Sequence, residues 1–298
     1  MNNYTKHPVL LIAYSRPVHM LKVLAKIADY FPDELYIFID GLPDNANSKL
    51  INLHQEVVKI AKGFDKAINI YIYLSPINLG CGNGPHTAID WVFLKENSAI
   101  ILEDDILPTK RFFEYVDENL VALEDSTCMM ISSNKYDRFP QFNKSIKTRY
   151  CFTNGWATWK RAWNVYSYKL STPIFDNVEA ILKHNLSALS RESDWADIVH
   201  KVRSGDTISF WDYQWQLSVW ANNGWSLQPP KNLTTNIGFD EFGTHTKNGD
   251  WRETIKAVET LNKIKPSYIE VGRLHHFIIS LYTTSLPGYV YRKFKIKI

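Results

Sequence analysis

Three consecutive carboxylates, Glu103, Asp104 and Asp105, follow the apolar run Ala99–Leu102. Such a run, bounded by turn signals, is typical of a buried strand, and open α/β sheets bind ligands beyond the carboxyl ends of their strands. Because strand side chains alternate between faces, we expect Glu103 and Asp105 on one side and Asp104 on the other. Clustered carboxylate oxygens suit Mg²⁺ or Mn²⁺. The same residues also fit an acidic surface turn in which an aspartate caps the following helix.

Two residues of the second half of the chain are also candidates for chemistry. Asp212 stands between Trp211 and Tyr213, and partial desolvation by aromatic rings would raise its pKa toward that of a useful general base. A helix N-cap is the competing interpretation of Asp212. His245 lies in a Gly-containing segment and could ligate a metal or contact a diphosphate, or could simply be a solvated loop residue.

Arg16 and Asp40 each follow an apolar run that is typical of a strand. Arg16 could meet a phosphate or a nucleobase, and Asp40 a nucleobase imide or a ribose hydroxyl. An ordinary surface arginine and an Asp-Gly turn are the alternatives. The Gly-rich segment 78–84 is expected to be a loop that allows close approach to a ligand, but it lacks the spacing of a phosphate-binding loop or a dinucleotide fingerprint.

Strands and helices that alternate along the first half would position these residues, and such alternation predicts a mostly parallel sheet flanked by helices. The expected strands are Pro8–Tyr14, Glu34–Ile39, Ile68–Leu74, Ala99–Leu102 and Cys128–Ser132, and the expected helices begin at Pro17 or span Asn47–Lys62, Pro85–Lys95 and Phe112–Leu123. The second half looks different, with an aromatic segment at 154–163, helices over 175–202, a further helical segment starting at 209–215 and an irregular loop at 232–246. We expect one domain over 1–298 with two halves, 1–150 and 151–298.

The composition excludes several classes of protein. A net charge of only +3 over 298 residues gives no field that would favour nucleic acid. The three cysteines lack metal-site spacing, and no apolar run approaches the ~20 residues that span a bilayer. We therefore expect a cytoplasmic protein. The basic and apolar tail 289–298 could touch anionic lipid at the inner face of a membrane, or could be a frayed end or an edge strand.

These segments together resemble nucleotide-sugar-dependent glycosyltransferases of the GT-A type, as found in the N-acetylglucosaminyltransferase I family and its bacterial relatives. The acidic triplet, followed by a proline and then by Phe112-Phe113-Glu114-Tyr115, is the most specific part of the resemblance. The segments that carry it are Pro8–Arg16, Phe38–Gly41, Ile100–Tyr115, Asn154–Trp163, Phe210–Trp215 and, more loosely, Asn236–Thr246. The Gly-rich segment 80–84 does not align cleanly, and 138–145 has no counterpart.

The resemblance implies a GT-A (Rossmann-like) nucleotide-binding half joined to an acceptor-binding helical and loop half. It implies a metal-dependent reaction that inverts the anomeric centre, with transfer from a nucleoside-diphosphate sugar, expected to be a UDP-sugar, to a hydroxyl of a glycan or glycolipid. The implied roles are the nucleobase for Arg16 and Asp40, the nucleotide sugar for Glu103 and Asp104, Mn²⁺ (or Mg²⁺) on the diphosphate for Asp105, and the catalytic base for Asp212.

Two other functions remain open on the same fold. A sugar-phosphate nucleotidyltransferase would be expected to carry a Gly-rich triphosphate loop with a lysine directly after the first strand, where Ser15-Arg16-Pro17 stands instead. A non-catalytic carbohydrate-binding protein is the second alternative. In the glycosyltransferase, Trp156, Trp159 or Trp211 could stack on acceptor sugar rings, although most tryptophans in such a chain are expected to be structural.

Overall fold

The computed structural model describes residues 6–135, 144–186, 192–205, 209–239, 256–258 and 268–270. Its strands are β1 (Val9–Ala13), β2 (Glu34–Ile39), β3 (Asn69–Leu74), β4 (Ser98–Glu103), β5 (Ile106–Pro108), β6 (Cys128–Ser132), β7 (Ser145–Thr148), β8 (Trp156–Trp159), β9 (Trp225–Gln228), β10 (Thr234–Asn236) and β11 (Tyr268–Glu270). Its helices are α1 (Pro17–Tyr30), α2 (Ser48–Gly63), α3 (Gly80–Phe93), α4 (Lys110–Ala122), α5 (Lys160–Trp163), α6 (Val178–Asn185), α7 (Glu192–Ser204) and α8 (Asp212–Ala221), with a 3₁₀ turn at Pro173–Phe175.

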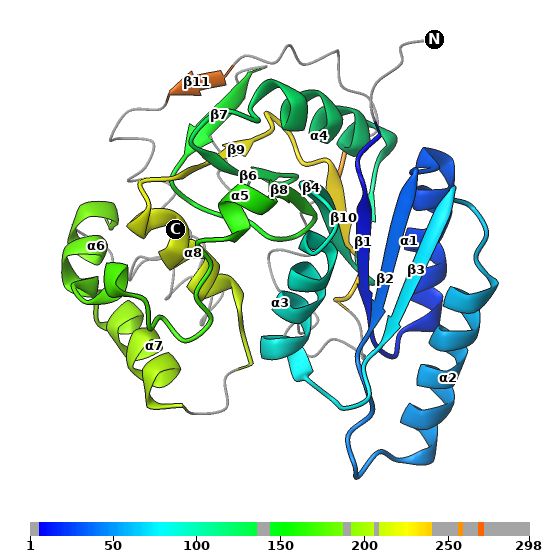
Figure 1. The fold of residues 1–298 in the computed structure, drawn as a ribbon. Coiled ribbons are helices and arrows are strands. Elements are labelled where there is room, and N and C mark those ends of the chain that lie inside the picture. Colours follow the sequence, from blue (N-terminus) through cyan, green and yellow to red (C-terminus); the bar gives the residue numbers. More distant parts are fainter. Residues whose placement is uncertain are drawn as a thin grey trace, which may run out of the picture.

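Nine of these strands form one central sheet in the order β11-β7-β9-β6-β8-β4-β1-β2-β3 (Figure 1). β1, β2, β3 and β4 are parallel, as expected, and β6 is parallel to β9. The sheet is nevertheless partly antiparallel, because β8 runs opposite to both β4 and β6 and β7 runs opposite to β9. The carboxyl ends of β1, β2, β4, β6 and β9 therefore share one edge.

The second half of the chain contributes more than the helices and loops that were expected of it. β8 lies between β4 and β6, with Ile100 opposite Ala157 and Ile101 opposite Trp156. β9 extends the same sheet on the far side of β6. The aromatic segment at 154–163 is thus a central strand followed by a short helix, which its tryptophans allow because aromatic side chains pack well on a pleated surface.

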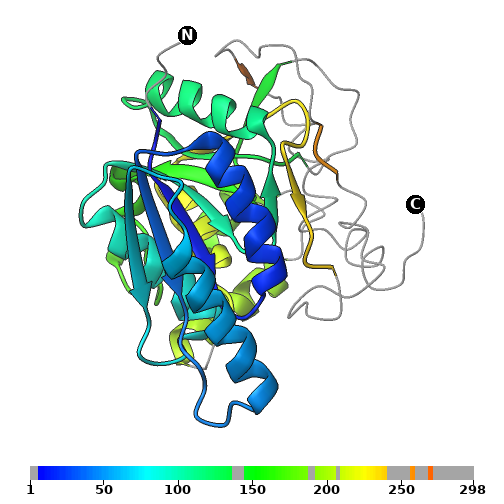
Figure 2. The same ribbon diagram turned by 90° about the vertical axis from the view of Figure 1, so that its right-hand side faces the viewer.

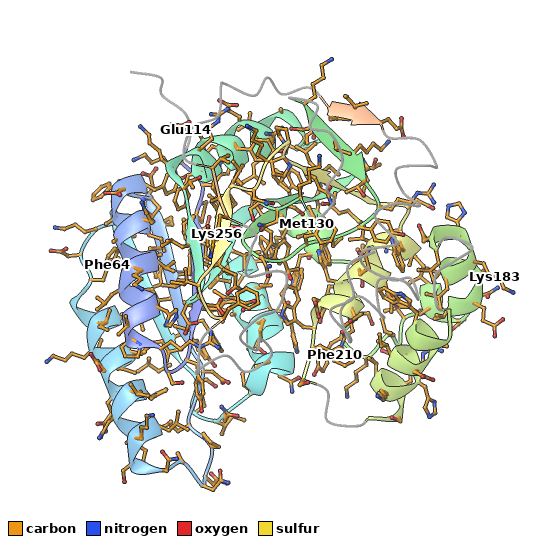
Figure 3. The ribbon with its side chains drawn as sticks, turned by 180° about the vertical axis from the view of Figure 1, so that it is seen from behind. Phe64, Glu114, Met130, Lys183, Phe210 and Lys256 are labelled. Atoms are coloured by element: carbon orange, nitrogen blue, oxygen red, sulfur yellow. The ribbon has the colours of Figure 1, made fainter. Side chains whose placement is uncertain are left out.

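Helices cover both faces of the sheet (Figure 2). One apolar cluster joins β1, β2 and β4 to α1, α2 and α4, and a second joins the opposite face to α3, α5 and α8. Both faces of these strands are therefore buried, which explains why their sequences are continuously apolar. Seen from behind, Met130 lies in the middle of the sheet and Lys183 on the outlying α6 (Figure 3).

A smaller lobe, made of α6, α7 and the outer face of α8, lies on the side of the molecule away from α2 (Figure 1). Its apolar cluster includes Leu182, Trp195 and Trp220. Trp220 also donates from Nε1 to the Arg149 carbonyl at 2.8 Å, which ties α8 to the end of β7. Among the described residues, no helix combines the length and the apolar character needed to cross a membrane.

The Gly-rich segment is not the loop that was expected, because α3 begins at Gly80 and contains Pro85. The helix starts here because the Asp40 carboxylate accepts hydrogen bonds from the Leu79 and Gly80 amides, each at 2.8 Å. A side chain distant in sequence thus satisfies amides that no local residue caps. The expected irregular loop at 232–246 likewise contains the strand β10, which pairs with β5.

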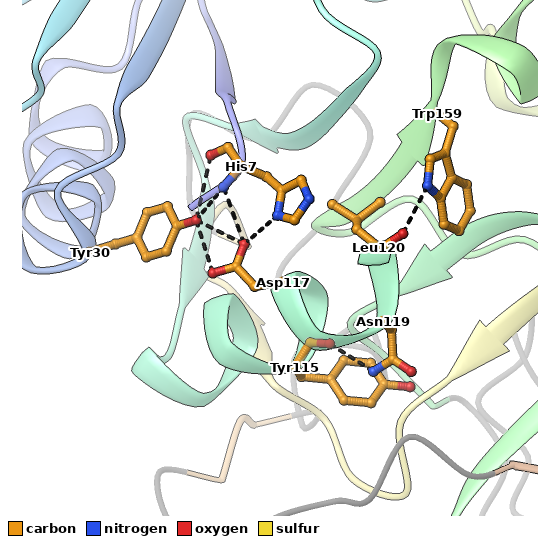
Figure 4. Close-up of polar contacts among 7 residues, drawn as sticks. All are labelled: His7, Tyr30, Tyr115, Asp117, Asn119, Leu120 and Trp159. Carbon is orange, nitrogen blue, oxygen red and sulfur yellow. Dashed lines mark hydrogen bonds and ion pairs between the residues drawn. The ribbon is translucent and has the colours of Figure 1, made fainter. Parts of the chain in front are cut away.

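A buried polar contact closes the opposite, amino-terminal end of β1 (Figure 4). His7 approaches the Asp117 carboxylate of α4 through Nδ1 at 2.8 Å, and Tyr30, the last residue of α1, donates to the same carboxylate at 2.9 Å. Tyr30 also stacks on Phe113 with ring centroids 4.2 Å apart. These contacts fasten β1, α1 and α4 together at the edge remote from the acidic residues.

Candidate active site

Arg16 and the acidic residues meet where two neighbouring parallel strands end. Ile12 of β1 is opposite Glu103 of β4, so the residues that follow each strand are adjacent. Arg16, which precedes the first residue of α1, places Nη1 2.8 Å from Asp105 Oδ2 and 3.3 Å from Asp104 Oδ1. The Tyr14 amide also donates to Asp104 Oδ2 at 3.3 Å.

The expected alternation of the three carboxylates is wrong beyond Glu103. β4 ends at Glu103, and Asp104 and Asp105 form a turn, so the two-residue period of a strand no longer applies to them. Both aspartates instead reach the same guanidinium of Arg16. The alternative of an acidic residue that caps the next helix is also wrong, because Thr109 caps α4 by accepting from the Phe112 amide.

The site concentrates negative charge in a buried place. Burial raises the pKa of Glu103, and the neighbouring charges of Asp105 and Asp104 raise it further, while Arg16 lowers it. Burial also raises the pKa of Asp104, again against the influence of Arg16. The charge of Asp212 also raises the pKa of Glu103, so Asp212 acts on the first carboxylate of the triplet. The two halves of the chain therefore meet at this site.

Asp105 has one carboxylate oxygen that Arg16 does not use. Its Oδ1 is buried and makes no hydrogen bond within the described part of the protein. No group of three or more acidic, histidine or cysteine side chains that could hold a metal occurs among the described residues. A cation that used this oxygen would take a single protein carboxylate and draw its other ligands from substrate and water, as Mg²⁺ commonly does; metal binding itself stays a prediction.

A short strap from residue 236 to 239 covers Asp105, and the sequence alone did not reveal it. The Ile237 amide donates to the Asp105 carbonyl at 2.8 Å, and His19 of α1 contacts the Ile237 carbonyl at 3.0 Å. A Cβ on Gly238 would lie 2.2 Å from Asp105 Oδ2, so only glycine allows this approach. His245, a candidate for ligating a metal or contacting a diphosphate, lies outside the described residues, as does the basic tail 289–298.

Asp40 is buried at the end of β2, and its carboxylate is engaged within the protein. Besides the amides of Leu79 and Gly80, it accepts from the Gly41 amide at 2.9 Å and from Asn78 Nδ2 at 3.3 Å. Burial raises its pKa in spite of these bonds, which act in the opposite direction. The Asp40 carboxylate thus anchors the start of α3. A contact between Asp40 and a nucleobase stays a prediction.

Asp212 is the first residue of α8, and Trp211 occupies the N-cap position without a capping side-chain bond. The competing interpretation, in which Asp212 itself is the N-cap, is therefore wrong. The neighbouring Trp211 stacks on Trp156 with ring centroids 5.6 Å apart, and Trp156 also contacts Trp215. Asp212 itself is partly exposed, so a substrate hydroxyl could reach it; its role as a base stays a prediction.

The tryptophans that were expected to stack on sugar rings are core residues. Trp156, Trp159 and Trp211 are only 1%, 3% and 5% exposed. Trp159 also uses its Nε1 to donate to the Leu120 carbonyl at 3.1 Å (Figure 4). Their abundance reflects packing between the sheet and its helices.

Comparisons with known proteins add little detail. No family model matches the chain, and no curated protein matches it. Matching solved structures include two of the glycosyltransferase GlyE from Streptococcus pneumoniae TIGR4. The first is 11% identical with a TM-score of 0.31, and the match covers 75% of this chain and 45% of the GlyE chain. The second, an apo form, is 12% identical with a TM-score of 0.32, and the match covers 98% of this chain and 63% of the GlyE chain.

This chain therefore spans less than two thirds of the length of either GlyE structure. Likeness at these identities and scores says nothing about activity, which rests on the chemistry of the site. Resemblance to the N-acetylglucosaminyltransferase I family stays a prediction.

Proposed function

We propose that this protein is a glycosyltransferase that moves a sugar from a nucleoside-diphosphate donor to a hydroxyl of a glycan or glycolipid acceptor, with inversion at the anomeric carbon. The observation that carries the proposal is the interaction between the acidic triplet and Asp212: the charge of Asp212 acts on Glu103, and Arg16 pairs with Asp104 and Asp105. They come from opposite halves of the chain and meet at the carboxyl edge of the sheet, where α/β proteins bind their ligands.

The donor end of the site would be held by the acidic turn. Asp105 is the residue that would hold Mn²⁺ or Mg²⁺, through the buried oxygen that has no partner in the described chain. Such a cation, when bound, neutralises charge on the departing diphosphate as a Lewis acid. Arg16 holds Asp104 and Asp105 in place and lowers the repulsion between them, so the pair is preorganised before the donor arrives. A UDP-sugar is the proposed donor.

The acceptor end would be served by Asp212. An inverting transfer needs one carboxylate that removes the proton of the attacking hydroxyl, as the base does in inverting glycoside hydrolysis. Asp212 is partly exposed and is the first residue of α8, and its neighbour Trp211 stacks on the buried Trp156. Partial desolvation by these rings would favour the proton-accepting role.

The decisive experiment compares Asp212→Asn with the native chain. Donors are first screened by thermal stabilisation with Mn²⁺ and UDP-, GDP- or dTDP-sugars, because a ligand of the native state raises its apparent stability. Turnover is then measured as release of nucleoside diphosphate. General base catalysis contributes ~10²–10⁴-fold, so Asp212→Asn should lose at least about two orders of magnitude while donor affinity is kept.

Glu179→Gln is the matched control, because Glu179 also lies in the first turn of a helix but belongs to α6. It should leave turnover unchanged. Full activity of Asp212→Asn would reject the base assignment. Release of inorganic pyrophosphate from a nucleoside triphosphate and a sugar phosphate would instead identify a nucleotidyltransferase, and binding of sugars without any turnover would identify a carbohydrate-binding protein.

A further inference from the structure

Tyr166 follows α5 and is held from two sides. Its ring stacks on Trp163 with centroids 4.3 Å apart and an angle of 10° between the planes. Trp163 is itself fixed, because its Nε1 donates to Asp90 Oδ1 of α3 at 2.6 Å. His86 of α3 also contacts the Tyr166 ring, at 5.9 Å between centroids. The Tyr166 ring is therefore packed against both α5 and α3.

The Tyr166 hydroxyl donates to the Trp211 carbonyl at 3.3 Å. The same carbonyl accepts the Trp215 amide at 3.2 Å, which is the first hydrogen bond of α8. Burial raises the pKa of Tyr166, and the charges of Tyr168 and Asp212 raise it further. The Tyr166 phenol therefore stays protonated and neutral at and well above neutral pH. It can donate a hydrogen bond near Asp212 without carrying a charge that would repel that carboxylate.

We infer that Tyr166 is a positioning residue for Asp212: its hydroxyl bond to the Trp211 carbonyl fixes the first turn of α8, and with it the direction of the Asp212 carboxylate. The inference rests on the proposed function, since it assigns a role to Asp212 as base. The first turn of a helix frays when its ends lack partners, and Asp212 is the first helical residue here. Tyr166 connects this turn to α3, and the Asp40 carboxylate anchors the start of that helix.

Tyr166→Phe isolates the effect, because it removes the hydroxyl and keeps the ring stack on Trp163. Tyr168→Phe is the matched control: the Tyr168 ring packs on His86 at 4.4 Å, and within the described residues its hydroxyl makes no hydrogen bond to α8. Both variants are compared with Asp212→Asn and with the double variant that carries Tyr166→Phe and Asp212→Asn. The assay is Mn²⁺-dependent hydrolysis of UDP-glucose, UDP-N-acetylglucosamine, GDP-mannose and dTDP-glucose, with water as the acceptor.

We expect Tyr166→Phe to lower kcat by roughly ten- to a hundredfold, the scale of loss that follows from a misplaced catalytic group, with the donor KM unchanged. If Tyr166 acts through Asp212, the double variant should be no slower than Asp212→Asn alone, because groups that act as a unit are not additive. Amide exchange at Trp215 should also become faster in Tyr166→Phe and stay unchanged in Tyr168→Phe.

The other outcomes separate this inference from the proposed function. Native kcat in Tyr166→Phe, or multiplication of the two losses in the double variant, would overturn the positioning role while Asp212 kept its own. Full activity of Asp212→Asn would reject the base assignment and this inference with it, and no hydrolysis of any of the four donors would overturn the proposed function.

Discussion

Asp105 uses its two carboxylate oxygens differently. One oxygen is paired with Arg16 at 2.8 Å, and the other is buried without a hydrogen-bond partner among the described residues. An orphaned buried acceptor is costly, and under the proposed function the bound cation would satisfy it. The Arg16 contact fixes the rotamer of Asp105, which aims the second oxygen before any cation is present.

Asp105→Asn should remove the Mn²⁺ dependence of nucleotide binding. The amide keeps the shape of the side chain but not its charge, and Asp104 continues to balance Arg16, so the fold should be retained. Calorimetric titration of UDP with and without Mn²⁺ checks this, with Asp44→Asn in an exposed loop as the control. A preserved Mn²⁺ effect in Asp105→Asn would place the cation elsewhere.

Gly238→Ala should damage the same site through packing. The new Cβ would lie 2.2 Å from Asp105 Oδ2, so either the strap or the carboxylate must move. Overpacking typically costs about 1–3 kcal/mol, and we expect a loss of unfolding free energy of that order together with weaker nucleotide binding. Urea unfolding and UDP titration measure the two effects.

Gly63→Ala is the appropriate control for Gly238→Ala, because nothing lies within 4 Å of the added Cβ at the end of α2. Alanine is the better helix former, so this variant should be equal to the native chain or up to about 1 kcal/mol more stable. If both alanine variants behave alike, the close approach of Gly238 to Asp105 has no energetic importance.

At the scale of elements, the contact of Tyr30 with Asp117 offers a test that depends on pH. Burial raises the pKa of Tyr30, and the Asp117 charge raises it further. Because the folded pKa lies above the unfolded value of about 10, the contribution of the phenol is fully present below pH ~10 and is lost as the pH rises beyond it. Tyr30→Phe should lower the unfolding free energy by about 1–3 kcal/mol at pH 7.

The difference in unfolding free energy between Tyr30→Phe and the native chain should shrink above pH 10. In that range the Tyr30 phenol of the native chain ionises when the chain unfolds, which favours the unfolded state, and Tyr30→Phe has no such group. Urea titrations at pH 7 and above pH 10 measure it. Tyr73→Phe on the exposed edge of the sheet is the control and should change stability little at either pH. A difference that grows with pH would contradict the assigned sign.

Much of the order of helices and strands could be predicted, because the sequence signals for these elements lie within a few residues of each one. The expected strand Cys128–Ser132 matches β6, and the expected helix Asn47–Lys62 matches α2 to within a residue, with Asn47 as its N-cap. Apolar runs and capping residues carry that information within a few positions of the chain. The acidic triplet and Asp212 could be singled out for the same reason. Three consecutive carboxylates after an apolar run, and a carboxylate between two aromatic residues, are both visible in the local sequence.

What the sequence could not show depends on contacts between distant residues. Asp40 anchors the start of α3, so the Gly-rich segment becomes a helix rather than a loop. Gly238 fits against Asp105 only because β10 pairs with β5. No local pattern reports such neighbours, and the conformational freedom of glycine points to a loop in each case.

For the whole molecule, the central position of β8 predicts one cooperative unfolding transition. β8 comes from the second half of the chain but pairs with β4 of the first half, so neither half keeps a complete sheet without the other. Of the ten tryptophans, only Trp91 precedes residue 151, so tryptophan fluorescence reports mainly on the second half, whereas far-ultraviolet circular dichroism reports on both. The two urea transitions should coincide. An earlier fluorescence midpoint would show that the second half unfolds on its own.

The same strand has a consequence for the chain while it is being made. β4 leaves the ribosome well before β8 does, and until β8 arrives the apolar strand Ser98–Glu103 has one unpaired edge. Synthesis proceeds at ~5–20 residues per second, so this edge stays open for some seconds in every nascent molecule. An open apolar edge is a template for pairing with another chain. Slow codons between Glu103 and Trp156, or a shortage of chaperone, should therefore lower the yield of native protein more than the same change placed after Trp159.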